Sequence, residues 1–161
     1  MDFRKLQFLL NRLSSSKYVE TFNYGVSISK ALTLVTENTH NLVRDNHKES
    51  LFKMRVEERF CDSIGVMHGG AIITLFDITN SLSIAALDKS NRANVTVELK
   101  TKYLNQIKQN DEIFIRCRKV HINNSIAHST GEIYLNISEN FIICAKSYQI
   151  SSLILDKNFQ L

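Results

Sequence analysis

The second half of the chain has the alternating hydrophobic pattern of β-strands. Between residues 94 and 104 (NVTVELKTKYL) apolar and polar side chains alternate, which predicts a strand with two different faces. One face is expected to carry Val95, Val97, Leu99, Thr101 and Tyr103, and the other Thr96, Glu98, Lys100 and Lys102. Three more strands are predicted at 111–121, 125–138 and 140–155, with a turn at 122–125 (INNS).

The first half predicts helices and two strands. Five apolar residues near the N-terminus share one helical face: Phe3, Leu6, Leu9, Leu10 and Leu13. Segments 30–45 and 49–60 have strand character and are joined around a polar stretch. Residues 70–88 then form a helix that is apolar on nearly all sides, which is typical of a buried helix.

The order of these elements indicates an α+β fold with an antiparallel sheet wrapped around one long central helix. In the third of the four strands, Ala127, Ser129 and Gly131 give one face small side chains, against which the helix can lie closely. The 161 residues include no proline, linker or internal repeat. We expect an N-terminal helical segment over 1–25 and one compact domain over 26–161.

Composition narrows the classes of partner. A net charge of +4 and a pI near 9.0 suit an anionic ligand. The basic residues are not clustered and Trp is absent, so nucleic acid is not expected. No run approaches the roughly 18 uncharged apolar residues of a membrane span. An odd number of cysteines without CxxC spacing indicates free thiols inside a cell.

The N-terminal segment bears on localisation. It combines basic residues with an apolar face, as an import sequence does, but Asp2 and Glu20 count against a transit peptide. We expect a helix that packs on the domain and a cytoplasmic protein, with a mitochondrial location as the alternative.

Polar residues form one stripe on the apolar helix: Thr74, Asp77, Asn80 and Ser81 are spaced by three and four. Asp77 is therefore a carboxylate on a mostly buried element, which is costly unless it is hydrogen-bonded. Two interpretations remain open at this point. Asp77 is either a structural acid bonded to its neighbours, or a general base or nucleophile in a cleft of low dielectric.

The sequence His68-Gly69-Gly70 opens this helix. The first backbone N–H groups of a helix are unpaired and carry partial positive charge, which suits a carbonyl oxygen that becomes an oxyanion. Asp77 lies nine residues after His68, so the first N–H groups of the helix and Asp77 are roughly 10–12 Å apart along its axis. One chain cannot easily apply both groups to one small carbonyl, whereas two antiparallel helices of a dimer can.

These residues resemble those of the hotdog-fold acyl-CoA thioesterases, specifically the PaaI-like group. The resemblance lies in G-x-x-H-G-G from Gly65 to Gly70, in the acid at Asp77, and in NVTVELKTKY, which is similar to the family's V-[ST]-V-[DE]-L strand. It implies a hotdog thioesterase domain that hydrolyses acyl-CoA to a free acid and coenzyme A, without a cofactor, in lipid metabolism. It also implies protomers paired into a continuous sheet, as a homodimer or, where two dimers associate, as a homotetramer.

The resemblance implies a role for each site residue. The Gly69 N–H polarises the thioester carbonyl, His68 shapes the turn, and Asp77 of the opposite protomer activates water or attacks directly. Thr96 matches a serine that helps to orient the water. Ser81 is a further candidate because it lies one turn beyond Asp77, and Gly70 belongs to the substrate-binding turn.

One position departs from the family pattern. Animal members have Asn, an amide donor, where this chain has Asp62, and an ionised carboxylate donates nothing. Either Asp62 is protonated, or Ser63 or a water replaces the donor, or Asp62 has another role such as a second base, or activity is weak.

Other ligands and functions follow from the remaining residues. The candidates for binding the phosphates of coenzyme A are Lys100, Lys102, Arg116 and Arg118. No metal is expected, because His40, His47, His121 and His128 lack ligand spacing.

A non-catalytic or weakly active acyl-CoA-binding protein is the main alternative to the hydrolase function. A hotdog dehydratase is less consistent with the sequence, since that class uses a differently placed acid–histidine pair.

Overall fold

The computed structural model describes residues 3–15, 24–36, 42, 49–90, 92–137 and 140–154. Its helices are α1 (Phe3–Ser14), α2 (Tyr24–Ala31), the short 3₁₀ helix η2 (Glu58–Phe60) and α3 (Gly69–Leu87). Its strands are β1 (Thr33–Leu34), β2 (Glu49–Arg55), β3 (Ala93–Tyr103), β4 (Glu112–Ile122), β5 (Ile126–Ile137) and β6 (Asn140–Ile154).

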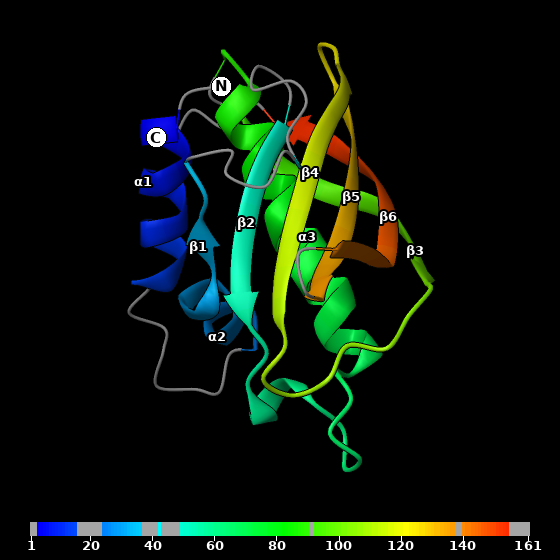
Figure 1. The fold of residues 1–161 in the computed structure, drawn as a ribbon. Coiled ribbons are helices and arrows are strands. Elements are labelled where there is room, and N and C mark those ends of the chain that lie inside the picture. The colour runs from blue at the N-terminus through cyan, green and yellow to red at the C-terminus, as the bar shows by residue number, and fades with distance from the viewer. Residues whose placement is uncertain are drawn as a thin grey trace.

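The strands form one antiparallel sheet in the order β1-β2-β4-β5-β6-β3, which curves around α3 (Figure 1). Helix α3 contacts every strand of the sheet from β2 to β6. The predicted α+β architecture, a hotdog fold with one long central helix and an N-terminal helix, is confirmed.

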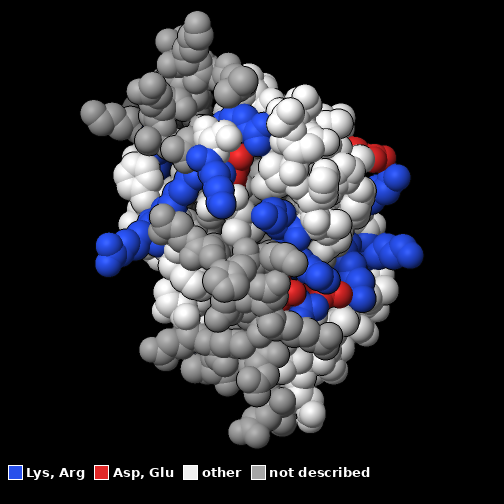
Figure 2. All heavy atoms as spheres, turned by 90° about the horizontal axis from the view of Figure 1, so that it is seen from above, with Lys and Arg blue, Asp and Glu red and all other residues white. Residues whose placement is uncertain are grey.

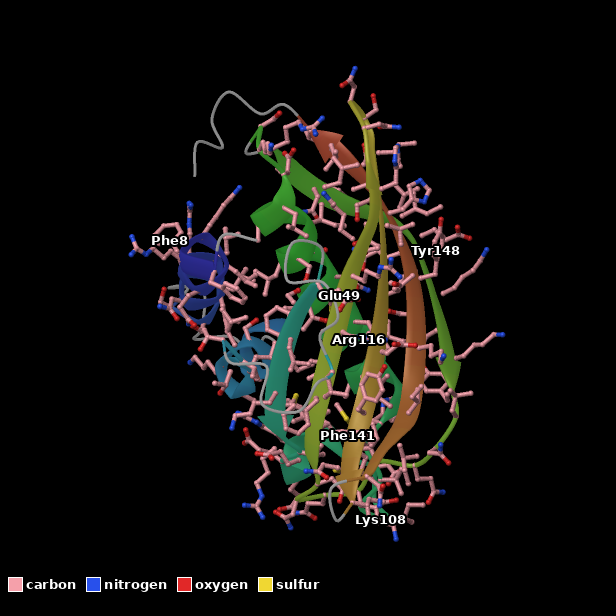
Figure 3. All side chains as sticks on the ribbon, turned by 45° about the horizontal axis from the view of Figure 1, so that its top comes forward. Phe8, Glu49, Lys108, Arg116, Phe141 and Tyr148 are labelled. Carbon is pink, nitrogen blue, oxygen red and sulfur yellow. The ribbon has the colours of Figure 1, made fainter. Side chains whose placement is uncertain are left out.

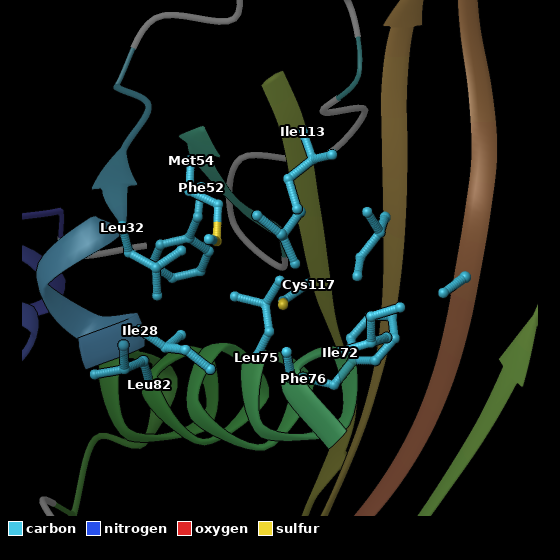
Figure 4. Packing of buried hydrophobic residues seen from close by; sticks show 14 of the residues in the cluster. Ile28, Leu32, Phe52, Met54, Ile72, Leu75, Phe76, Leu82, Ile113 and Cys117 are labelled. Carbon is cyan, nitrogen blue, oxygen red and sulfur yellow. The ribbon is translucent and has the colours of Figure 1, made fainter. Parts of the chain in front are cut away.

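The core fills the space between α3 and the inner face of the sheet. Figure 4 shows Leu75 of α3 extending towards Phe52 of β2 and Cys117 of β4. Burial raises the pKa of the Cys117 thiol to about 12, and all three cysteines are free, as expected.

The N-terminal helices join the same core. Leu6, Leu9 and Leu10 of α1 are buried in the cluster that contains α3, so this helix packs on the domain as predicted. Ile28 of α2 is fully buried there as well. The predicted boundary between residues 25 and 26 lies within α2.

One expectation for an individual element was wrong. The segment predicted as a strand from residue 30 begins inside α2, and its described strand is only Thr33–Leu34; residues 37–41 and 43–45 lie outside the described part.

Helix α3 is long and apolar enough to cross a membrane by length and composition, with a mean hydropathy of 1.5. Because 56% of that window is buried inside the fold, α3 is explained as the core helix.

The alternation predicted for β3 is broken by a β-bulge between Thr96 and Glu98. A bulge inserts one extra residue, so the side chains beyond it change faces. Leu99 packs against the core and Thr101 is half-buried, whereas Val95 and Val97 are 52% and 68% exposed. Thr96 therefore faces α3, whereas Lys100 and Lys102 point to the opposite face of the strand. The sequence pattern had placed all three residues on one face.

Candidate active site

A tight loop leads into α3. Cys61 pairs with Met67, and Gly65 takes a positive φ of 76° at the turn between them. Asp62 stabilises this loop, because its Oδ1 accepts hydrogen bonds from the N–H groups of Ile64 and Val66, both at 3.0 Å. The Asp62 side chain is exposed, as is that of Ser63.

His68 is the N-cap of α3. Its Nδ1 accepts from the Gly70 N–H at 3.0 Å, and its carbonyl oxygen accepts from Ala71 and Ile72. The Gly69 N–H makes no hydrogen bond to any described residue. It is therefore the one early N–H of α3 left for a ligand, and it lies at the positive end of a 19-residue helix.

A cavity of about 370 Å³ lies beside Gly69. Its wall is largely apolar and includes Met67, Ile72 and Ile107, and the Tyr103 hydroxyl donates to the Gly69 carbonyl oxygen at 3.2 Å. A hydrogen-bond donor at the edge of an apolar cavity can hold the oxygen of a carbonyl whose remaining atoms are apolar.

The second polar centre lies further along α3. The Thr96 hydroxyl of β3 donates to Asp77 Oδ1 at 2.5 Å, a length typical of a bond from a hydroxyl to a carboxylate. Asp77 is half-buried, so it is shielded by the fold yet reachable from outside. The structure brings these two predicted residues together within one chain.

Gln149 of β6 connects this pair to a third predicted residue. Its Nε2 lies 3.0 Å from each of three hydroxyl oxygens, those of Ser81, Thr96 and Ser151. Gln149 is fully buried, and its Oε1 has no hydrogen-bond partner in the described part of the chain. The sequence analysis did not identify Gln149; its only local signal is an amide that alternates with Ser147 and Ser151 along β6.

Asp77 and the Gly69 N–H are separate on one chain. Asp77 lies eight residues after Gly69 in the helix, which corresponds to about 12 Å at 1.5 Å per residue. A thioester carbonyl held by Gly69 is thus out of reach of Asp77 of the same chain.

The four predicted basic residues lie elsewhere. Arg116, labelled in Figure 3, lies on β4 next to the fully buried Cys117 and so points to the outer face of the sheet. By the same alternation, Arg118 points to the outer face as well. There Arg116 pairs with Glu132 and donates to the Leu42 carbonyl oxygen.

The two lysines lie on the outer face of β3, as the shifted register requires. Lys100 pairs with Glu98 at 3.1 Å and is largely exposed, and Lys102 is exposed too. Across the face shown in Figure 2, basic side chains are spread out and do not form one patch.

Within the described residues, no group of three or more His, Cys, Asp or Glu side chains is arranged to hold a metal ion. The chemistry that the described groups offer is hydrogen-bond donation from a helix N-terminus and proton transfer by Asp77.

Comparison with known proteins agrees with the fold. Residues 64–137 match the sequence profile of the thioesterase superfamily. A search of curated protein sequences gave no significant match.

Many solved structures are similar to this chain, including the following three. Zebra fish thioesterase superfamily member 2 has a TM-score of 0.76 and 17% identity, with 96% of this chain and 99% of that chain covered. The Mus musculus thioesterase superfamily member 2 gives 0.69 and 17%, with 91% and 96% covered. A hypothetical thioesterase from Streptococcus pneumoniae, solved with coenzyme A, gives 0.64 and 18%, with 78% and 87% covered. At these identities the likeness establishes the fold.

Proposed function

Because residues 64–137 match the sequence profile of the thioesterase superfamily, we propose that the protein hydrolyses the thioester bond of acyl-CoA, releasing a free carboxylic acid and coenzyme A. One observation carries the proposal: the unengaged Gly69 N–H at the start of a buried helix, beside an apolar cavity. The Streptococcus pneumoniae protein of similar fold was solved with coenzyme A, which supports the choice of thioester.

The proposed reaction uses two groups on opposite sides of the carbonyl carbon. The Gly69 N–H donates to the carbonyl oxygen and stabilises the negative charge that develops there. Asp77 accepts a proton from a water molecule as that water attacks the carbon. The thioester C–S bond then breaks, and protonated Asp77 gives its proton to the departing sulfur, which leaves as the thiol of coenzyme A while the Asp77 carboxylate is restored. No cofactor is required.

The 12 Å between these groups is the reason for proposing a homodimer, in which Asp77 acts on a thioester bound at Gly69 of the other copy. Strand β3 supplies a surface for it. Its 11 residues pair with β6 on one side and with no described strand on the other, and the edge exposes Val95 and Val97. Such an edge readily pairs with another strand. A continuous sheet through two β3 strands fits this surface, and assembly of two dimers into a tetramer extends the proposal.

We further propose that the protein belongs to the PaaI-like group and acts in lipid metabolism. It works in the cytoplasm, with the mitochondrion as the alternative. The phosphates of coenzyme A bind basic side chains, for which Lys100, Lys102, Arg116 and Arg118 remain the candidates.

The test is release of coenzyme A from acyl-CoAs of several chain lengths, measured by thiol detection with the purified protein. Asp77→Asn removes the base and keeps the size of the side chain, and is expected to lower kcat by about 10²–10⁴-fold. The matched control is Glu98→Gln, the same chemical change on the outer face of β3, which should leave kcat within about two-fold. Equal rates for wild type and Asp77→Asn would contradict the proposed role.

A second function is favoured by Asp62. Its Oδ1 is used within its own loop, and a carboxylate offers no donor to a thioester oxygen. If the Gly69 N–H alone stabilises the developing oxyanion too weakly, the protein binds acyl-CoA with little turnover. Calorimetric titration with a non-hydrolysable acyl-CoA thioether separates the two functions, since tight binding with no release of thiol from the thioester supports the second.

A further inference from the structure

The fully buried amide of Gln149 lies where three elements meet. It belongs to β6, where its register partners are Leu99 of β3 and Ser129 of β5, and its side chain reaches Ser81 of α3. It therefore links the helix that carries Asp77 to the strand that carries Thr96.

Proton counting determines how this amide is oriented. The Thr96 hydroxyl has one proton, which it donates to Asp77 Oδ1. Towards Gln149, 3.0 Å away, the Thr96 oxygen can therefore only accept, so the facing atom of the amide must be an N–H donor. The second N–H of the amide is then shared between the Ser81 and Ser151 oxygens.

We infer that Gln149 is a positioning residue, which holds the Thr96 hydroxyl in the orientation that donates to Asp77; its catalytic consequence rests on the hydrolase function proposed above. With Thr96 occupying Oδ1, the carboxylate is fixed in rotation and Oδ2 is left to accept the proton of the attacking water. Without the Gln149 N–H, the Thr96 hydroxyl can turn away, and the carboxylate loses its fixed geometry.

Packing alone does not account for this residue. The Gln149 Oε1 has no partner among the described residues, and a buried acceptor without a donor is unfavourable. An apolar side chain of similar shape avoids that cost. The amide is thus expected to matter more for the geometry of Asp77 than for the stability of the fold.

Asn80 is the matched control. It is likewise a fully buried amide whose oxygen has no partner among the described residues, but its Nδ2 donates to Ser147 and has no link to Thr96 or Asp77. Gln149→Met and Asn80→Leu therefore remove the same chemical group from two neighbouring places.

The experiment measures kcat, KM and Tm for four proteins: wild type, Gln149→Met, Thr96→Val and the double variant. Gln149→Met is expected to lower kcat by about 10- to 100-fold, with KM within about two-fold and Tm within about 3 °C. In the Thr96→Val background, Gln149→Met should cause no further loss beyond about two-fold, because both act through one hydrogen bond. Asn80→Leu should keep kcat within about three-fold.

Several results would overturn the inference. They are a Gln149→Met protein with the wild-type kcat, losses that multiply in the double variant, or an equal loss in Asn80→Leu. A wild-type protein no faster than Asp77→Asn is a separate result: it refutes the hydrolase function, and the positioning role fails with it. An active wild type with independent losses refutes the positioning role alone.

Discussion

Replacing Gly131 by alanine tests how closely the sheet must approach α3. A Cβ at this position of β5 would lie 2.7 Å from Phe76 Cδ1 and 2.7 Å from Ser147 Oγ. Carbon atoms in contact normally stay about 3.5–4.0 Å apart, so the ring or the strand must move by about 1 Å. Phe76 is fully buried, and there is no solvent into which its ring can turn.

The displacement has a structural and a catalytic cost. Overpacking of this kind costs about 1–3 kcal/mol of unfolding free energy, which corresponds to a Tm lower by about 3–10 °C for a domain of this size. Phe76 directly precedes Asp77 on α3, so a shifted helix also moves the carboxylate relative to Thr96. A misplacement near 1 Å can lower kcat by up to about 10²-fold.

Calorimetry and the thiol-release assay measure both effects. Ser129→Ala is the control, because Ser129 lies two residues earlier on the same fully buried face and its Oγ has no partner in the described chain. We expect it to leave Tm unchanged or slightly higher. Adding Phe76→Leu to Gly131→Ala should recover part of the lost Tm. If Gly131→Ala keeps the wild-type Tm and kcat, the requirement for close packing is refuted.

Three other predictions concern the site, the outer face and the edge strand. Asp62→Asn keeps an acceptor for the N–H groups of Ile64 and Val66 and adds a donor for the thioester oxygen, so kcat should rise by about 10²-fold. An unchanged rate in the thiol-release assay would mean that residue 62 stabilises its loop and takes no part in the reaction. Glu132 is partly desolvated, but hydrogen bonds from a tyrosine, a lysine and an arginine hold its pKa at about 2, below the ordinary 4.5. The contribution of ionised Glu132 to stability is therefore complete above about pH 4.5 and disappears as the pH falls towards 2. The urea concentration at the unfolding midpoint should fall more over this range for the wild type than for Glu132→Gln. Val97→Lys should shift the protein to monomer in sedimentation, since a lysine on an exposed edge opposes strand pairing; a dimer that survives would place the contact elsewhere.

Local sequence pattern was sufficient for several features of this protein. The apolar character of residues 70–88 on all sides predicted a buried helix, and the small side chains around Gly131 predicted the strand face that lies against it. His68-Gly69-Gly70 predicted the start of that helix, because glycine and cap chemistry act over a few residues. The location of Asp77 on this helix followed from the same periodicity.

Tertiary structure decided the features that depend on contacts distant in sequence. The bulge at Val97 places Thr96 on the face towards Asp77. A bulge is an extra residue relative to the paired strand, so the residues of one strand alone do not predict it. Gln149 reaches Thr96 across 53 positions and Ser81 across 68, so its role is visible only once β6 and β3 are paired. The sequence by itself therefore determined which helix carries the acid and how that helix begins. The register between strands decided which side chains surround the acid, because register depends on pairing across the whole sheet.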